Sequence, residues 1–198
     1  MTREQILARI RTANAAAASQ PPPIPRDYRT EGAYPPGDPH LVELFTDRLV
    51  DYKATVHTTT PDTLESLVDS IAGEWTLVAP VGVQGNGETD KPHTHAELDR
   101  VDAVVTRCAA ACAETGTIVL DGGDGQGRRA LSLIPDRHIC IVAADQIVHT
   151  VPELLRRLDP TRPLTFISGP SATSDIELNR VEGVHGPRTL IVVIVSTA

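Results

Sequence analysis

The stretch "TLIVVIVS", residues 189–196, is the most hydrophobic part of the chain and has only apolar side chains between its first threonine and its last serine. A strand with one solvent-exposed face alternates apolar and polar residues, whereas a continuous β-branched run is typical of a strand buried on both faces. Shorter runs of the same character lie upstream at residues 117–120 and 139–143. Strands of this kind occur mainly in parallel sheets that helices cover on both sides.

Helical patterns lie between these apolar runs. Leu64, Val68 and Ile71 have helical spacing after the helix-starting pair Thr60-Pro61, and Gly73 marks an end. The alternation predicts an α/β fold with a mostly parallel central sheet flanked by helices. The expected strands are residues 54–57, 75–79, 101–106, 117–120, 131–134, 139–143, 164–168 and 189–196. The expected helices are residues 2–18, 40–49, 60–73, 107–114 and 151–158, and residues 80–100 are expected to form a polar loop.

The first 39 residues differ in composition from the rest. Residues 1–18 are predicted to form an amphipathic N-terminal helix, in which Thr2 and Gln5 have the spacing of a capping box. The proline-rich residues 19–39 favour an extended tether without regular structure. We therefore expect an N-terminal helix, a tether, and one α/β domain at residues 40–198.

Composition limits the class of protein. The net charge of −8 and the pI near 5.3 argue against a general nucleic-acid or membrane-surface binder, because both need a basic surface. No segment has the length and apolarity of a membrane span, and residues 1–18 lack the basic-then-apolar order of a signal peptide. Three cysteines without close pairing fit a reducing compartment. We expect a cytoplasmic protein that binds neither nucleic acid nor membrane.

Two loops have unusual composition. In "AETGT", residues 113–117, Glu114, Thr115 and Thr117 have side chains that could face a substrate, and Gly116 could instead be a left-handed turn residue. In "GGDGQGRR", residues 122–129, glycine-rich backbone precedes two arginines, Arg128 and Arg129. This pattern suits an anion such as a carboxylate or phosphate, although a solvated loop is an equal alternative.

The third loop follows the predicted strand 164–168. Its "SGPSATSD" offers Gly169, Ser171 and Thr173 as backbone and hydroxyl groups for an anion. Asp175 could equally cap a helix that runs through Glu177. Downstream, "GVHGPR" presents His185 between two glycines, of which Gly186 is the second, followed by Arg188. A loop histidine is a candidate acid or base. Arg188 could hold a substrate carboxylate or pair with Asp175 or Glu177. Because ligands usually bind at the carboxyl ends of parallel strands, we expect the three loops to meet there.

Other sites are weaker. His93, His95 and Glu97 share one face only in a strand, so we expect no metal site in that loop. Cys108 and Cys112 fit core packing better than cluster ligation, and the chain lacks a dinucleotide, P-loop or serine-hydrolase motif. We expect no cofactor on this chain.

Together the segments resemble the lactate-utilization protein C family, whose members consist of one lactate-utilization domain. The resemblance rests on "AETGTIVL" (113–120), "GRRALSLIPDRHICIV" (127–142), "SGPSATSDIE" (168–177) and "GVHGPRTLIVVIV" (183–195). It implies a fold related to sugar-phosphate isomerases and coenzyme A transferases, and a role in oxidising L-lactate to pyruvate beside iron–sulfur proteins. Ala172 stands where other members often have arginine, which removes one candidate anion contact.

The resemblance covers all the candidate residues above. The positions that match the family's motifs are Glu114, Thr115, Gly116, Thr117, Arg128, Arg129, Gly169, Ser171, Thr173, Asp175, Glu177, His185, Gly186 and Arg188.

Three functions stay open at this point. The first is a non-redox subunit of a lactate-oxidation system, in which an arginine holds a small carboxylate and His185, with Asp175 or Glu177, moves a proton. The second is a stand-alone isomerase or coenzyme A transferase-like enzyme for a phosphorylated or acyl substrate, with Glu114 as base or nucleophile. The third is an adaptor that docks through the N-terminal helix and tether.

Overall fold

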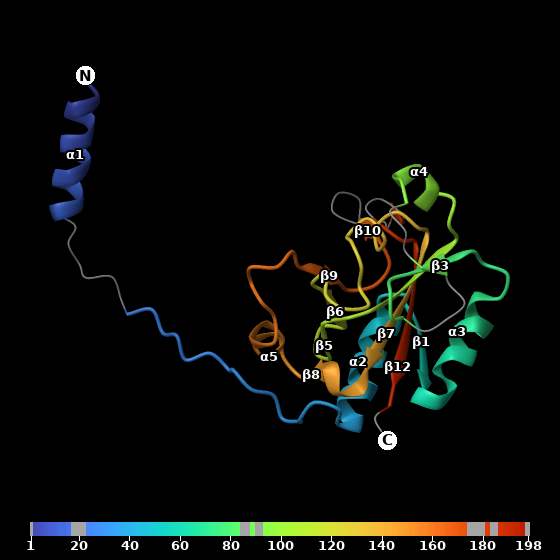
Figure 1. Cartoon of the computed structure of the whole chain (residues 1–198). Helices are drawn as coiled ribbons and strands as arrows, with labels where there is room; N and C mark the ends of the chain where they lie inside the picture. The colour runs from blue at the N-terminus through green and yellow to red at the C-terminus, as the bar shows by residue number, and fades with distance from the viewer. Residues whose placement is uncertain are drawn as a thin grey trace.

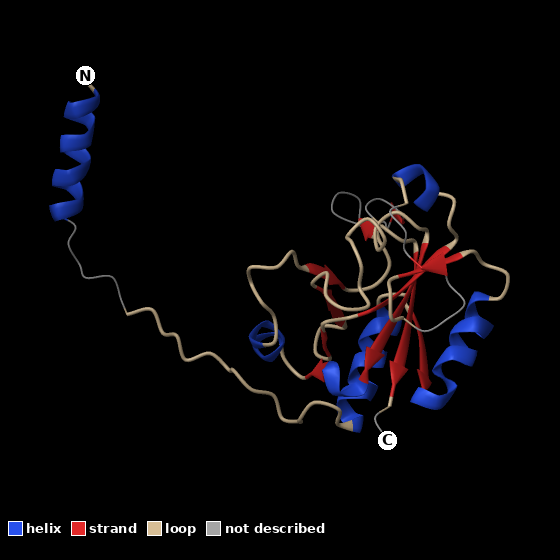
Figure 2. Cartoon of the chain, in the orientation of Figure 1, coloured by secondary structure: helices blue, strands red, loops and turns tan. Residues whose placement is uncertain are grey.

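A six-stranded parallel sheet forms the centre of the molecule (Figures 1 and 2). The computed structural model describes residues 2–16, 23–83, 88–89, 93–173, 181–182 and 186–196. The strand order is β1-β12-β7-β4-β2-β3, and every neighbouring pair is parallel. The strands are β1 (Thr55–Thr59), β2 (Leu77–Ala79), β3 (Glu88–Thr89), β4 (Ala103–Arg107), β7 (Arg137–Ala143) and β12 (Thr189–Val195).

The apolar stretch that opened the sequence is β12, and it lies between two parallel neighbours. It pairs with β7 over its whole length, from Thr189 opposite Arg137 to Val195 opposite Ala143, and with β1 on its other side. All five inner residues of β12 are buried. The predicted α/β class with a mostly parallel sheet is therefore confirmed.

Helices cover both faces of this sheet, as the continuous apolar pattern predicted. On one face, α2 (Pro39–Asp51) packs Leu41, Phe45 and Leu49 against a cluster that includes Val192 and Ile194. On the other face, the short 3₁₀ turn Pro61–Thr63 leads into α3 (Leu64–Ala72), which packs against the alternate residues of β12. Alternate strand residues point to opposite faces, so every inner position of β12 has an apolar partner.

A second, smaller sheet packs on the α2 side of the central one. Its order is β8-β5-β6-β9, with β5 antiparallel to β6, β6 antiparallel to β9, and β8 parallel to β5. The short helix α5 covers its outer face through Leu154. The elements are β5 (Ala110–Cys112), β6 (Thr117–Leu120), the 3₁₀ turn Ala144–Gln146, β8 (Ile147–Val148), α5 (Val151–Arg156) and β9 (Thr165–Ile167). Two more short strands, β10 (Ala172–Thr173) and β11 (Val181–Glu182), pair antiparallel.

Three local predictions were wrong. Residues 107–114 were expected to be helical, but Ala110–Cys112 is the buried strand β5, where tertiary pairing outweighs the helix propensity of alanine. Residues 131–134 were expected to be a strand, but they form turns in which Leu131 and Ile134 donate to the carbonyls of Arg128 and Ala130. Within the expected loop 80–100, α4 (His95–Leu98) forms one helical turn.

The N-terminal part consists, within its described residues, of one helix and a segment without regular structure. Helix α1 (Arg3–Ala16) begins with the predicted capping box, in which Thr2 and Gln5 bond each other's backbone amides. Residues 23–38 contain no helix or strand. The second half of this segment contacts the body, because the amide of Ala33 donates to His149 Nδ1 at 2.9 Å. Figure 1 shows α1 apart from the body. None of the helices in the described ranges is both long and apolar enough to cross a membrane.

Gly116 gives a test of the packing between the two sheets and α2. It has φ +59° in the β5–β6 turn, and a Cβ there would lie 2.8 Å from Cβ of Arg48 on α2. Gly116→Ala should lower the free energy of unfolding by about 2–4 kcal/mol, because left-handed strain and overpacking add. Gly122→Ala is the control, since φ is +69° but the nearest described atom lies 3.9 Å away. It should cost only about 1–2 kcal/mol. Equal losses in urea unfolding would contradict the packing argument.

Candidate functional site

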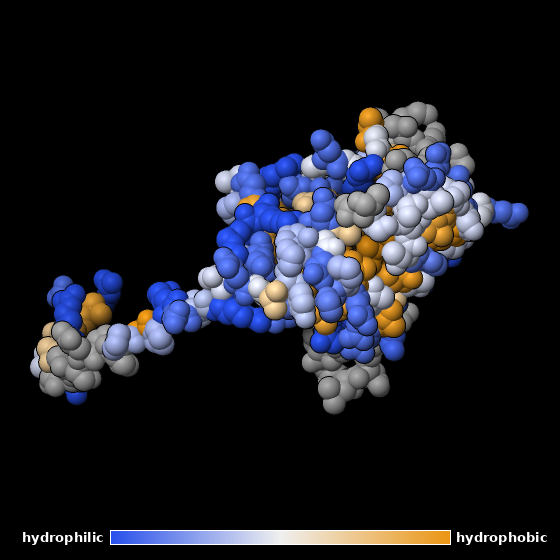
Figure 3. Space-filling model, turned by 90° about the horizontal axis from the view of Figure 1, so that it is seen from below, coloured by the Kyte–Doolittle hydropathy of each residue, from blue (hydrophilic) through white to orange (hydrophobic). Residues whose placement is uncertain are grey.

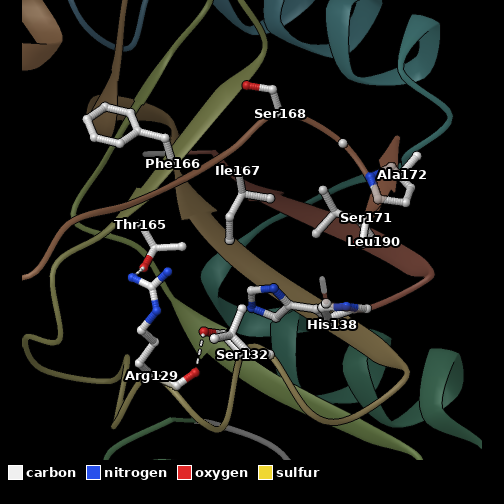
Figure 4. Close-up of a pocket in the computed structure, with 15 residues that line it drawn as sticks. Arg129, Ser132, His138, Thr165, Phe166, Ile167, Ser168, Ser171, Ala172 and Leu190 are labelled. Carbon is white, nitrogen blue, oxygen red and sulfur yellow. Dashed lines mark hydrogen bonds between the residues drawn. The ribbon is translucent and has the colours of Figure 1, made fainter. Parts of the chain in front are cut away.

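A pocket of about 340 Å³ lies on the α2 side of the central sheet, at the amino ends of β7 and β12 (Figure 4). His138 and Leu190, the second residues of these two strands, form part of its wall. Residues 129–133, the strand β9 with the loop after it, and residues 186–187 complete the lining. The pocket therefore lies where segments far apart in the sequence meet.

Arg129 gives the pocket its charge. It is the only charged residue among the described residues that line the pocket. Its Nη1 donates to Thr165 Oγ1 at 3.1 Å, which leaves most of the guanidinium donors available to a ligand (Figure 4). A guanidinium without a facing carboxylate in this lining, surrounded by hydroxyl groups, favours a small anion.

The "AETGT" loop reaches the pocket through hydroxyl groups. Thr117 Oγ1 lies 2.8 Å from Ser168 Oγ, which lines the pocket, and 2.7 Å from Thr115 Oγ1. Glu114 is placed elsewhere, since its Oε1 accepts from Arg29 Nη2 at 2.6 Å and the described pocket lining does not include it. Gly116 has the turn role described above. The loop thus supports the pocket wall, while its carboxylate faces the N-terminal segment.

The loop after β9 is shaped by a glycine. Gly169 has φ +96°, and a Cβ at this position would lie 2.8 Å from Cβ of Tyr52 and 2.9 Å from its carbonyl oxygen. The amide of Ser171 donates to the carbonyl of Pro187 at 2.8 Å, which joins this loop to the segment before β12. Gly169, Ser171 and Gly186 therefore lie together in the lining with Arg129.

His138 is a functional candidate that the sequence analysis missed. The side chain is 1% exposed, and Nε2 lies 2.7 Å from Thr106 Oγ1 on β4. Burial lowers the pKa of His138 to about 4, because desolvation disfavours the charged imidazole. The imidazole is therefore neutral at pH 7. The sequence contains one indication of this candidate, the polar His138 at the start of the otherwise apolar run "HICIVA". A polar residue at such a position is more often part of the core than of a functional site.

The position of the pocket corrects one expectation. We predicted that the three loops would meet at the carboxyl edge of the central sheet, but the pocket lies at the amino ends of β7 and β12. The loops belong to β5, β6 and β9 of the smaller mixed sheet, so the rule for open parallel sheets does not apply to them. Two hollows of about 460 and 410 Å³ lie at the carboxyl edge, and neither lining includes a predicted site residue. Figure 3 views this edge from below and shows apolar residues exposed on it.

Known proteins resemble this chain in sequence and in structure. The profile of the LUD domain matches residues 81–195, which include β4 to β12 and the described pocket lining. A protein of Deinococcus radiodurans named "Lactate utilization protein C" is 43% identical over 207 aligned residues, covering 98% of this chain and 97% of its own. The chain belongs to the LUD domain family. A protein of the same name from Halalkalibacterium halodurans is 28% identical over 74% of the chain and 75% of its own length.

A solved structure agrees with this assignment. The crystal structure of a DUF162 family protein from Deinococcus radiodurans superposes with a TM-score of 0.68 at 39% identity. The match covers 79% of this chain and 96% of the other. The fold of the LUD domain described above is thus shared with a protein solved by crystallography.

The remaining predicted residues of the LUD domain lie outside the pocket lining or outside the described residues. Arg128 donates to the carbonyl of His93. Arg188 Nε donates to Asp136 Oδ1 at 2.6 Å, so it contacts an acid that was not expected. Thr173 lies in β10. Asp175, Glu177 and His185, predicted to move protons, lie outside the described residues.

The sequence analysis predicted no metal site at His93, His95 and Glu97, in the loop before β4. Among the residues that the structure describes, no group of three or more His, Cys, Asp or Glu side chains could hold a metal ion. Glu97 instead completes a capping box, in which its Oε2 accepts from the backbone amide and hydroxyl of Thr94.

The buried histidine predicts a pH-dependent stability of the LUD domain. The pKa of His138 is about 4 in the folded state, and the usual value is 6.5, so the unfolded chain binds the proton first as the pH falls. The contribution to stability is complete above pH 6.5 and is lost between pH 6.5 and 4, by about 2 kcal/mol at pH 5. His138→Gln should remove this part of the difference between urea unfolding at pH 7 and pH 5. An identical pH dependence in both proteins would contradict the buried neutral imidazole.

Proposed function

We propose that the chain acts in L-lactate utilization as a component without an iron–sulfur cluster, and that it binds a small carboxylate in the Arg129 pocket. The names of its relatives support a role in lactate utilization. The observation that carries the binding proposal is the guanidinium of Arg129, the one charged group in the described lining, beside serine hydroxyls. A three-carbon acid is small enough for a pocket of about 340 Å³.

Electron transfer is assigned to partner subunits. A typical iron–sulfur cluster needs four cysteine thiolates, and this chain has three cysteines. All three are free and buried. We therefore propose that iron–sulfur subunits of the same system take the electrons from lactate, while this chain holds the carboxylate or organises the complex.

The alternative function, that of a stand-alone isomerase or coenzyme A transferase-like enzyme, has less support than carboxylate binding. An isomerase or coenzyme A transferase-like reaction was assigned to Glu114 as base or nucleophile. The carboxylate of Glu114 is held by Arg29, and the described pocket lining does not contain it. We therefore retain the carboxylate-binding proposal.

Two neighbouring arginines provide a matched test of binding. Arg129→Gln should weaken L-lactate binding to the isolated chain by about tenfold, because a charge-assisted hydrogen bond is lost. Arg128→Gln removes the same charge from the next residue, whose guanidinium contacts the carbonyl of His93, and should change the dissociation constant by less than about twofold. Isothermal titration calorimetry measures both. Equal effects would indicate general electrostatics and would contradict a site at Arg129.

The role in the system is tested by reconstitution. Lactate-dependent dye reduction by the co-purified complex should fall when this chain is omitted and return when it is added back. Addition of the Arg129→Gln protein should restore less activity than the Arg128→Gln protein. Unchanged turnover without the chain would rule out a required role.

A further inference from the structure

Residues 29–34 of the proline-rich segment bind along one side of the body, and we call them the strap. At its first end, Arg29 Nη2 donates to Glu114 Oε1 at 2.6 Å, in the turn between β5 and β6. The carbonyl of Thr30 accepts from Arg156 Nη2 at 2.7 Å. Because Arg156 is the last residue of α5, the strap connects the β5–β6 turn with this helix.

The middle of the strap is held through its backbone. The amide of Gly32 donates to Glu153 Oε1 at 3.1 Å, and the amide of Ala33 donates to His149 Nδ1 at 2.9 Å. Gly32 lies so close to this histidine that a Cβ at position 32 would lie 2.3 Å from Cβ of His149. The ring of Tyr34 stacks on the imidazole, with ring centroids 5.7 Å apart. The body therefore holds the strap as a peptide-binding protein holds its ligand.

The hydrogen bond between Ala33 and His149 has only one possible direction. A backbone N–H group can only donate, so Nδ1 of His149 is the acceptor. This nitrogen therefore has no proton while the strap is docked, and the neutral ring has its proton on Nε2. A second proton can add only at Nδ1, where it would face the amide hydrogen of Ala33. Docking of the strap thus requires an uncharged His149.

The charges around His149 do not remove this requirement. Glu153 attracts a charged imidazole, but both residues belong to the body, so the attraction acts whether the strap is docked or released. The strap has one arginine and one glutamate, and docking brings no net charge to the ring. The charged and titratable groups on the surrounding elements are Arg29, Glu31 and Tyr34 on the strap, Cys112 on β5, Glu114 in the β5–β6 turn, Glu153 and Arg156 on α5, and Asp38 and His40 at the start of α2.

A second histidine, His40, also contacts the strap but has a different role. Its ring stacks on Tyr34 with centroids 4.7 Å apart, and its Nδ1 lies 2.8 Å from Asp38 Oδ1. A proton on His40 strengthens the contact with the carboxylate of Asp38, since a charge-assisted hydrogen bond is stronger than a neutral one. Protonation of His40 therefore does not oppose docking, in contrast to protonation of His149.

We propose that the surface formed by Glu114, His149, Glu153 and Arg156 is a docking site for the strap of the same chain, and that protonation of His149 releases the strap. The released form binds one more proton than the docked form, so acid favours release. Once the ring of the released form is charged, each further unit of pH lowers the ratio of docked to released strap by up to about tenfold. Histidine is the side chain that ordinarily changes its charge between pH 5 and 8, so this is the range to test.

Release changes how far the N-terminal helix can reach. With the strap docked, the segment between α1 and the body ends at Arg29. With the strap released, this segment ends at Asp38, where α2 begins. The difference adds up to about 30 Å to the reach of α1, at about 3.4 Å per extended residue. The strap is thus a pH-dependent control on the position of α1.

Backbone order of the strap in the full ¹⁵N-labelled chain measures docking. The NMR order parameter of the amides of Gly32 and Ala33 should be about 0.85 at pH 7.5, as in rigid backbone, and below about 0.6 at pH 5. Gly32→Ala should give the low value at both pH values, because the added Cβ overlaps His149. A wild-type strap with a low order parameter at pH 7.5 would overturn the docking site.

Substitution of the two histidines separates their roles. In His149→Asn, the amide oxygen can accept from Ala33 in place of Nδ1 but takes up no proton, so the order parameter should be the same at pH 7.5 and pH 5. His40→Asn is the matched control and should keep the pH dependence of the wild type. A pH dependence that survives in His149→Asn, or that disappears in His40→Asn, would overturn the assignment to His149.

The wild-type chain provides a test without any substitution, which decides the matter if His149→Asn leaves the strap released at both pH values. ¹⁵N NMR of the imidazole at pH 7.5 should show His149 with its proton on Nε2 and none on Nδ1. The ring should then gain its second proton over the same pH range in which the order parameter of Ala33 falls. A proton on Nδ1 at pH 7.5, or a charged ring beside a strap that stays ordered, would overturn the inference.

Discussion

The parallel pairing of β12 with β7 is the constraint on which the rest of the structure depends. These two strands pair over seven residues each, and apolar layers cover both of their faces. Their continuous burial explains why the sequence has no alternation there, since neither face meets water. It also gives any polar residue on these strands a large desolvation penalty. His138 is that residue on β7, and it stays in place because Thr106 on the neighbouring strand supplies a hydrogen bond.

The smaller sheet packs against this core and forms part of the pocket wall. By packing on the α2 side of the central sheet, it brings β9 and the loop after it over the amino ends of β7 and β12. The buried strands supply a fixed imidazole, and the turn after "GGDGQG" supplies a guanidinium. The hydrogen bond between the hydroxyl groups of Thr117 and Ser168 stabilises the pocket wall. A site built on strands and short hydrogen-bonded loops is suited to a small, rigid ligand.

Much of the fold could be predicted from local pattern, because the pattern and the final environment agree. Residues 189–196 and 139–143 are buried strands in both, and the helix after Thr60 ends at Gly73 as its spacing indicates. Ala110–Cys112 could not be predicted, because its strand conformation comes from pairing with β6 and β8. Arg129 was one of three equivalent arginines in the sequence, and only the folded chain separates it from Arg128 and Arg188. The contact of His138 with Thr106 could not be predicted, because the two residues lie 32 positions apart in the sequence.

The proposed ligand site lies at the amino ends of β7 and β12, opposite the edge that parallel sheets usually use. A crystal structure of the chain grown with L-lactate tests this most directly. We predict a bound lactate whose carboxylate contacts the guanidinium of Arg129. Lactate bound instead at the carboxyl edge, in the hollow beside Arg107 and Asp145, would contradict the account.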